Sequence, residues 1–185
     1  NMLSLVTAMQ RQTASSAASL AEFNKSFGDR IQALARSTDL LVDGGWSSVD
    51  LAQLVRAQLD PFLHLQGKGV DVAGPTVALG PQALQLIGMA LHELATNSTK
   101  YGVMSGGGGD IRCHWSHTEQ GGLRFQWVET GITFDPSAKK ASGFGSKVLS
   151  VLAPAMVDGS ADTVTSEDAL TWTVTIPAAH LGKVT

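Results

Sequence analysis

The sequence predicts an α+β protein in which an N-terminal antiparallel helical hairpin precedes an α/β sandwich, a mixed sheet with helices on one face. Three observations support this prediction. Apolar residues recur at helical spacing through residues 1–45. Residues 111–127 and 170–176 alternate apolar with polar side chains, as half-buried strands do. Helical segments lie before and between these strands, which suits helices packed on one sheet face.

The composition is that of an ordinary globular protein. Of the 185 residues, 43% are apolar and 16% are charged, and the formal net charge is −3. The slightly acidic balance argues against a dedicated nucleic-acid-binding protein. No stretch approaches the roughly 20 apolar residues of a membrane-spanning helix. The single cysteine, Cys113, excludes a disulfide within the chain and favours a reducing, cytoplasmic compartment. Its place in an alternating segment predicts a packing role.

Two helices are predicted within residues 1–45. The first is expected to end near Ser16, and the second carries an apolar stripe from Leu20 through Phe27 to Leu34. Neither helix can bury its stripe alone. A hairpin packed within one chain and an intermolecular dimerisation bundle both satisfy this pattern, so a monomer and a homodimer stay open.

A domain boundary is predicted at Gly44-Gly45, which ends the second helix. It separates the helical hairpin, residues 1–45, from a second domain, residues 46–185. That domain is expected to start with a helix ending near Phe62, because serine and aspartate side chains before it can cap its first turn. A short strand is expected around Val70.

A long helix is expected from Pro81, because proline suits a first turn, where its missing N–H would have no partner anyway. Its core side carries Leu84, Ile87, Leu91 and Leu94. After a glycine run, two strands over 111–115 and 123–127 are joined by a glycine-containing turn. A helix over 146–156 and a strand over 170–176 complete the predicted order.

The long helix carries a polar face. Glu93, Asn97 and Lys100 are spaced i, i+4 and i+7 and therefore share one side. A carboxylate, an amide and an ammonium group can form a metal–phosphate site, in which the Asn97 amide oxygen is a suitable ligand for Mg²⁺ and Lys100 supplies charge to phosphate. A solvated helix surface explains the same spacing, and the helix alone does not decide between the two.

Two glycine-containing turns favour the phosphate site. Glu129 and Gly131 stand at the end of a predicted strand, and Gly143-Phe144-Gly145-Ser146 opens a predicted helix. Glycine lets a backbone approach a ligand closely, and the free N–H groups of a helix start attract phosphate. Each turn alone is weak evidence, but the three elements in this order indicate a nucleotide site.

With these segments the chain resembles the HWE family of sensor histidine kinases, whose ATP domain has the Bergerat (GHKL) fold shared with gyrase-type ATPases. Residues 92–102 are similar to the family's N box, and Trp127-Val128-Glu129 to its first glycine box. Residues 143–146 resemble the second glycine box. Residues 11–13 and 31–36 resemble the dimerisation and phosphotransfer helices. The resemblance thus extends over nearly the whole chain.

The resemblance implies the catalytic core of a two-component protein-histidine kinase. Such a core would bind Mg-ATP and pass the γ-phosphoryl group to a histidine and then to an aspartate of a response regulator, under a sensor domain upstream in the same polypeptide. Asn97 would coordinate Mg²⁺ with Glu93 beside it, and these two are the catalytic candidates. Glu129 stands where related kinases have an aspartate that accepts a hydrogen bond from the adenine amino group.

The full set of ATP-binding residues that the resemblance implies is His92, Asn97, Lys100, Tyr101, Glu129, Gly131, Gly143, Phe144, Gly145 and Ser146. The segment between Gly131 and Gly143 would form a lid. Two members of the motifs need separate weighing. His92 lies about 100° around the helix from Glu93, so a structural role stays open beside ligand contact. Trp127 alternates with Phe125 and is expected to lie mainly in the core.

The family's phosphoaccepting histidine is expected four residues before Asn1, because Asn1-Met2-Leu3 resembles the last residue of its motif and the start of the helix after it. The first histidine of the chain itself is His64, and the histidines outside the N box show no metal-ligand spacing. The missing acceptor motivates one alternative, a degenerate scaffold that binds a response regulator without using ATP. The other is a gyrase-like ATPase in which Glu93 activates water, although the preceding hairpin argues against it.

Overall fold

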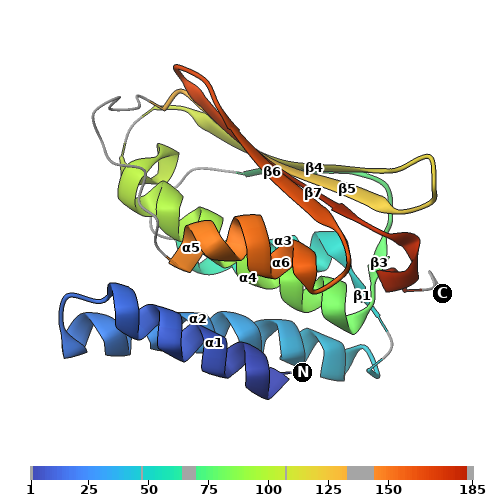
Figure 1. Ribbon diagram of the computed structural model, residues 1–185. Coiled ribbons are helices and arrows are strands. Elements are labelled where there is room, and N and C mark those ends of the chain that lie inside the picture. The colour runs from blue at the N-terminus through green and yellow to red at the C-terminus, as the bar shows by residue number, and fades with distance from the viewer. Residues whose placement is uncertain (1, 47, 64–69, 107, 133–143, 183–185) are drawn as a thin grey trace.

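The computed structural model describes residues 2–46, 48–63, 70–106, 108–132 and 144–182. They form three layers (Figure 1). A helical hairpin is the lowest layer in that view, a set of helices lies in the middle, and a sheet covers the top. The middle helices therefore pack on one sheet face only, as the alternation predicted, and the α+β fold class is confirmed.

The hairpin consists of α1 (Met2–Ser16) and α2 (Leu20–Asp43), which confirms the two predicted helices. The start of α2 is closed by reciprocal capping. The Ser19 hydroxyl accepts from the Glu22 N–H at 3.1 Å, and the Glu22 carboxylate accepts from the Ala18 N–H at 2.8 Å. Gly44 ends the helix, its N–H donating to the Leu40 carbonyl.

The middle layer contains α3 (Leu51–Leu63) and α4 (Pro81–Tyr101). The Asp50 carboxylate caps α3 by accepting from the Gln53 N–H at 3.1 Å, and Pro81 occupies the first turn of α4. The predicted capping at the start of α3 and the predicted proline in the first turn of α4 are both confirmed.

The predicted helix over 146–156 needs a correction. The helical run begins earlier, as α5 (Phe144–Lys147), widens to a π-helical turn, η2 (Val148–Leu152), and ends as α6 (Ala153–Ala155). Pro154 lacks the N–H that would continue the α-helical pattern, and the Ala153 N–H donates back to the Val148 carbonyl, five residues earlier. The wide turn thus ends two residues before a proline.

The sheet has the order β2-β4-β5-β7-β6, with β2 parallel to β4 and the other pairs antiparallel. The bounds are β2 (Val70–Ala73), β4 (Asp110–His117), β5 (Leu123–Thr130), β6 (Ser160–Thr165) and β7 (Ala169–Ile176). A second, two-stranded sheet pairs β1 (Val49–Asp50) with β3 (Ala78–Leu79). Strands β1, β3 and β6 were not predicted from the sequence. Single-turn 3₁₀ segments, η1 (Val103–Ser105) and η3 (Ala178–His180), complete the chain.

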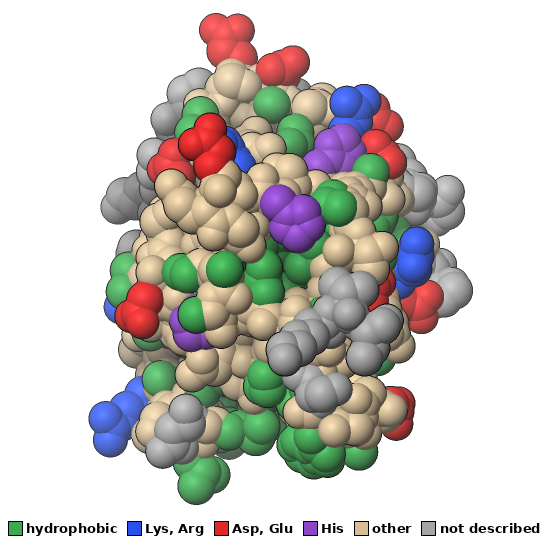
Figure 2. All heavy atoms as spheres, turned by 90° about the vertical axis from the view of Figure 1, so that its right-hand side faces the viewer, with side chains coloured by type: hydrophobic (Ala, Val, Ile, Leu, Met, Phe, Trp, Pro, Cys, Tyr) green, Lys and Arg blue, Asp and Glu red, His purple; other side chains and the backbone are tan. Residues whose placement is uncertain are grey.

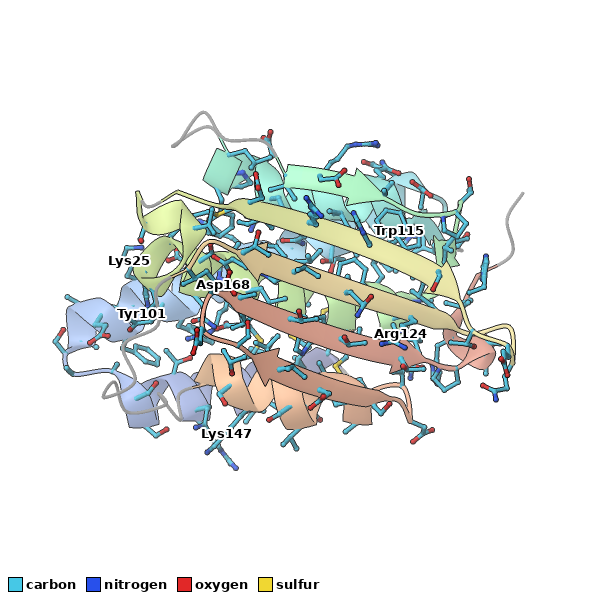
Figure 3. The ribbon with its side chains drawn as sticks, turned by 90° about the horizontal axis from the view of Figure 1, so that it is seen from above. Lys25, Tyr101, Trp115, Arg124, Lys147 and Asp168 are labelled. Atoms are coloured by element: carbon cyan, nitrogen blue, oxygen red, sulfur yellow. The ribbon has the colours of Figure 1, made fainter. Side chains whose placement is uncertain are left out.

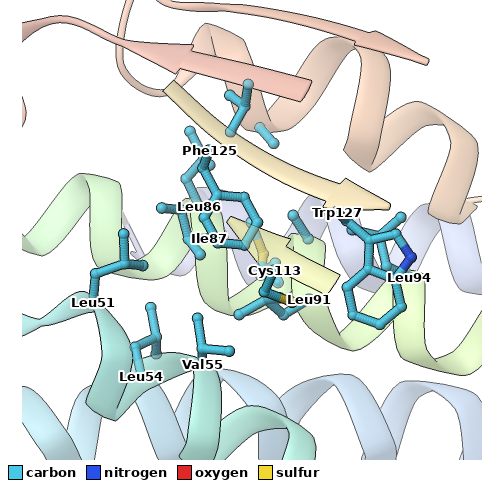
Figure 4. Close-up of a cluster of buried hydrophobic side chains, with 14 of the residues drawn as sticks. Leu51, Leu54, Val55, Leu86, Ile87, Leu91, Leu94, Cys113, Phe125 and Trp127 are labelled. Carbon is cyan, nitrogen blue, oxygen red and sulfur yellow. The ribbon is translucent and has the colours of Figure 1, made fainter. Parts of the chain in front are cut away.

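The core lies between the sheet and α4 (Figure 4). Apolar residues of α3 and α4 meet the inward side chains of β4 and β5, among which Phe125 and Trp127 are fully buried. Cys113 is buried among them, as predicted, and burial raises the pKa of its thiol to about 12. The predicted core side of α4 is confirmed, since Leu84, Ile87, Leu91 and Leu94 are all buried.

The hairpin packs on the middle layer mainly through α2 against α4. Of the predicted stripe, Leu34 is buried and Phe27 packs partly against the core, whereas Leu20 is 75% exposed. Met9 and Leu41 belong to the buried core, so the two layers are continuous. Figure 2 looks at the end of the molecule where α1 begins and α2 ends, and apolar side chains gather along the lower part of this face. The exposed large apolar residues of these helix ends are Met2, Leu3, Val42 and Trp46.

Candidate nucleotide site

The polar face of α4 changes character along its length. Glu93 is buried, with only 3% of its surface exposed, whereas Asn97 and Lys100 are exposed. A solvated helix surface therefore describes the last turns of α4 but not Glu93. A buried carboxylate is costly unless it is paired, so the partner of Glu93 is the first feature of the site to establish.

The partner of Glu93 is Arg30, from α2 of the hairpin. Arg30 Nε donates to Glu93 Oε1 at 2.7 Å, and Arg30 Nη2 donates to Glu93 Oε2 at 3.2 Å. The third nitrogen, Nη1, donates to the Thr13 hydroxyl of α1 at 3.0 Å. This planar, two-point pairing is the geometry in which guanidinium and carboxylate interact most strongly. One carboxylate of the N-box segment is thus held by both helices of the hairpin.

The second glycine segment lies directly against this carboxylate. A methyl group added at Gly145 would lie 2.7 Å from Glu93 Oε2 and 3.6 Å from the Asn97 amide nitrogen. A larger residue there would have to displace the Glu93 carboxylate, so glycine suits this position. The structure thus brings together three predicted site residues, Glu93, Asn97 and Gly145. Gly143 lies outside the described residues, as does the lid over 133–143, and the side chain of Phe144 is not described.

A second buried carboxylate, Glu129, lies where β5 ends. Its Oε1 accepts from the Ser98 hydroxyl at 2.5 Å and from the Val103 N–H at 2.6 Å, and its Oε2 accepts from the Trp127 indole N–H at 3.3 Å. The Ser98 hydroxyl accepts in turn from the Met104 N–H at 3.1 Å. Residues i and i+2 of a strand share a face, which explains the Trp-x-Glu pair: the indole orients the carboxylate.

The turn after Glu129 needs glycine. Gly131 has a φ of +77°, a conformation that L side chains rarely adopt, and a methyl group there would lie 2.8 Å from the Cα of Gly109. A side chain at Gly102 would collide with the Glu129 carboxylate. Gly131 thus lies against the backbone of Gly109, and Gly102 lies against the side chain of Glu129.

His92 faces the hairpin and α3, away from the exposed side chains of α4. It is 7% exposed, and its ring lies 5.9 Å from the ring of Phe62. Burial lowers the pKa of His92, a direction that nearby Glu93 opposes and that Arg36 and Arg30 reinforce. Its Nδ1 has no hydrogen-bond partner among the described residues. This position favours a packing role for His92.

The remaining predicted residues lie at the margin. Lys100 and Ser146 are exposed, and Tyr101 is 70% exposed. In Figure 3, Tyr101 lies toward the same end of the molecule as Asp168, opposite the end marked by Trp115 and Arg124. The site is therefore open at the end of α4. Trp127 is fully buried, which confirms its predicted core position.

Sequence reasoning missed three residues that complete the site, Arg30, Thr13 and Ser98. A signal for Arg30 existed, because it lies three, four, seven and eleven residues before the buried positions of α2, and a charged residue in a buried stripe needs a partner. The buried positions of α2 are Ala33, Leu34, Ser37 and Leu41. Nothing comparable marked Thr13 or Ser98, which are unremarkable helical residues in the sequence.

Comparison with known proteins shows a similarity to histidine kinases. The HWE histidine kinase family model matches residues 1–76, which contain the hairpin and α3. The proteins of this family are histidine kinases, and the resemblance recognised in the sequence is confirmed over this part of the chain.

Relatives in this family match over much of the chain. The blue-light-activated histidine kinase of Rhizobium johnstonii is 28% identical over 180 residues, covering 97% of this chain and 50% of that protein. The blue-light-activated histidine kinase of Brucella anthropi is 29% identical over 154 residues, covering 80% of this chain and 31% of that protein. The chain thus spans half or less of the length of these relatives.

Solved structures confirm the fold. The histidine kinase domain of the Erythrobacter litoralis blue-light-activated histidine kinase superposes with a TM-score of 0.71 at 18% identity, over 97% of this chain and 87% of that one. The catalytic domain of the histidine kinase ThkA gives 0.52 at 14% identity, over 71% and 96%. The predicted Bergerat architecture of the second domain is the architecture of these neighbours.

The described residues offer neither a membrane-spanning helix nor a preformed metal cage. None of the described helices is both long and apolar enough to cross a bilayer. No group of three histidine, cysteine, aspartate or glutamate side chains among those residues could enclose a metal ion. A Mg²⁺ ion commonly binds through one or two protein oxygens together with substrate phosphates, which requires no such group.

Proposed function

We propose that this chain is the catalytic core of a sensor histidine kinase that binds Mg-ATP between α4 and the two glycine segments. The observation that carries the proposal is the convergence of Glu93, Asn97 and Gly145 in a chain whose first 76 residues match the HWE histidine kinase family. The triphosphate end of a nucleotide and its metal fit this set of groups, which is one carboxylate, one exposed amide and the backbone of a glycine.

At the phosphate end, each residue has a separate role in this proposal. The exposed Asn97 amide oxygen holds Mg²⁺, which neutralises phosphate charge when it is bound. Glu93 lies beside it and orients the metal's water ligands. Lys100, exposed in the last turn of α4, supplies a further positive charge. Gly145 and Ser146 offer backbone N–H groups at the start of the helical run over 144–155.

At the base end, Glu129 accepts a hydrogen bond from the adenine amino group. An ionised carboxylate has about four acceptor positions, and the protein fills three of them through Ser98, Val103 and Trp127. Oε2 accepts only one of these three hydrogen bonds, so it is the oxygen that can accept another. A carboxylate at this position selects a base-edge donor, which adenine has and guanine lacks there. Gly131 and Tyr101 line the turn beside the base.

The reaction is phosphoryl transfer. The bond between the γ-phosphorus and the β,γ-bridging oxygen breaks, a bond to an imidazole nitrogen forms, and ADP leaves. Positioning and charge neutralisation supply most of the catalysis in such transfers, which suits a site with no obvious nucleophile of its own. One fold neighbour, ShkA, was solved in complex with AMPPNP (TM-score 0.51, 18% identity). We extend nucleotide binding to this chain.

The wider system is inferred from the family. The phosphoryl acceptor is a histidine preceding Asn1 in the longer protein, the onward acceptor is an aspartate of a response regulator, and a sensor domain precedes the hairpin. Relatives that are light-activated histidine kinases support these partners. Residues 1–45 serve as the dimerisation and phosphotransfer unit, and residues 46–185 as the ATP-binding domain.

The test is phosphorylation of a chain extended upstream to include the acceptor histidine. With labelled Mg-ATP we expect an acid-labile, base-stable phosphoprotein, and replacement of the acceptor histidine by glutamine should abolish it. If the protein gains no label, the result would contradict the kinase proposal and favour a scaffold that binds a response regulator without using ATP. Steady phosphate release without an acceptor would instead favour an ATPase that uses Glu93 to activate water.

A further inference from the structure

The hairpin reaches into the nucleotide site through Arg30. The contact joins α2 to α4, and its two partners are 63 positions apart in sequence. Only 14% of the Arg30 side chain and 5% of the Glu93 side chain are exposed. A buried, two-point ion pair is strongly sensitive to the loss of either partner, because the remaining charge is left without compensation.

Arg30 is itself held in place by a hydrogen bond to α1. Its Nη1 donates to the Thr13 hydroxyl, and that hydroxyl donates to the Met9 carbonyl at 2.6 Å. Thr13 is 1% exposed and Met9 belongs to the core. The guanidinium therefore has three nitrogens engaged and a defined orientation. Such preorganisation is typical of groups that hold another side chain in place for function.

The carboxylate held by Arg30 lies beside the proposed phosphate position. Glu93 Oε2 faces the backbone of Gly145, close to the Asn97 amide. Without a cation, Glu93 would repel the phosphates of an incoming nucleotide, and at this degree of burial solvent would screen that repulsion weakly. Arg30 cancels the charge and keeps both carboxylate oxygens in one orientation.

We propose that Arg30 is a positioning residue of the nucleotide site, supplied by the hairpin, which orients Glu93 and offsets its charge beside the phosphates. The inference rests on the proposed function, because it assumes that Mg-ATP occupies this site. In this proposal the hairpin, when it is docked on α4, completes the phosphate end of the site. The conformation that binds ATP is therefore the conformation in which the hairpin is docked.

The experiment is calorimetric titration of the intact chain with Mg-AMPPNP. Arg30→Met should weaken binding by at least about tenfold, the scale on which contacting, coupled residues act. The matched control is Arg11→Met, the same chemical change at an exposed position of α1, which should stay within about twofold.

A double-mutant cycle tests whether Arg30 acts through Glu93. In a Glu93→Gln background no buried carboxylate is left to balance, so Arg30→Met should then weaken Mg-AMPPNP binding by less than about threefold. Equal factors in the two backgrounds would show that Arg30 does not act through Glu93, and that result would overturn the inference.

Two milder variants keep the inference testable if Arg30→Met fails to fold, which circular dichroism would reveal. Arg30→Lys retains the charge but loses the fork geometry, and Thr13→Val removes only the support behind Arg30. Both should weaken Mg-AMPPNP binding, Thr13→Val the less of the two, and unchanged binding in both would overturn the inference. If the wild-type chain binds and Arg30→Met binds equally well, this inference alone fails. If the wild-type chain binds no nucleotide, the proposed function fails with it.

Discussion

The two buried carboxylates of the site are held in different ways. Glu129 is held from within the sheet and middle layers, by Ser98 of α4, the Val103 backbone and Trp127 of the same strand. Glu93 is held from outside them, by Arg30 of the hairpin. The proposed base end is therefore complete whenever the sheet and α4 are packed, whereas the proposed phosphate end also depends on where the hairpin lies.

This difference suits a signalling enzyme. A protein can regulate the part of a site that depends on a separate layer without disturbing the part that depends on its own core. The α2–α4 contact can change by movement of a helical pair, but the contacts of Glu129 can change only if α4 or the sheet is disrupted. Substitutions can test each side of this comparison, and the largest effect on stability is expected at Glu129.

Replacement of Glu129 by alanine should lower the free energy of unfolding by about 3 kcal/mol, because three buried donors lose their acceptor at once. Urea denaturation of the full chain measures it. Glu119→Ala, at an exposed position after β4, is the matched control and should change stability by less than about 0.5 kcal/mol. Similar effects at the two positions would show that the Glu129 network is not a stabilising unit.

Replacement of Ser98 by alanine should cost about 2 kcal/mol, since a hydrogen bond to a charged group is lost and the Met104 N–H loses its acceptor. The same denaturation measurement applies. Ser116→Ala, exposed on β4, provides the control and should be nearly neutral. If Ser98→Ala were neutral too, the base end would not depend on this hydroxyl, and the contrast with Arg30 would weaken.

The burial of His92, which lies beside the hairpin contact, should make the stability of the fold depend on pH. Burial lowers its pKa in the folded state, so the unfolded chain binds the proton more readily, and stability falls as the pH drops below the ordinary histidine value of about 6.5. Between about pH 7.5 and about pH 5.5 we expect the wild type to lose about 1 kcal/mol more stability than His92→Gln. Denaturation curves at both pH values measure the difference, and parallel losses in the two proteins would refute a buried neutral His92.

Local patterns predicted much of the fold, and where they failed the cause is visible. The hairpin, the helix from Pro81 and the strands containing Trp127 and Trp172 have strong periodicity and buried faces. The edge strand β6 is almost wholly exposed, so it lacks the alternation that marks a strand. The π-helical turn before Pro154 leaves the number of helical residues almost unchanged and is invisible to periodicity.

The site was predicted only in part, for a related reason. Spacing on α4 placed Glu93 and Asn97 on one side, and the glycine segments indicated a phosphate ligand. The contacts that fix the carboxylates cross long sequence distances, 63 positions for Arg30 with Glu93 and 31 for Ser98 with Glu129. No local pattern encodes such pairs. The division of the chain into two domains after residue 45 stays a prediction. The hairpin and the middle layer on either side of that boundary share one core.

The most direct measurement is the affinity of the intact chain for Mg-AMPPNP, with and without the Asn97 amide. The account predicts one nucleotide bound per chain. Asn97→Ala should weaken binding by at least about tenfold through loss of the metal ligand, while the matched exposed change Asn24→Ala on α2 should leave binding unaltered. Binding that survives Asn97→Ala unchanged, or a wild-type chain that binds no nucleotide, would contradict the central claim that this face of α4 holds Mg-ATP.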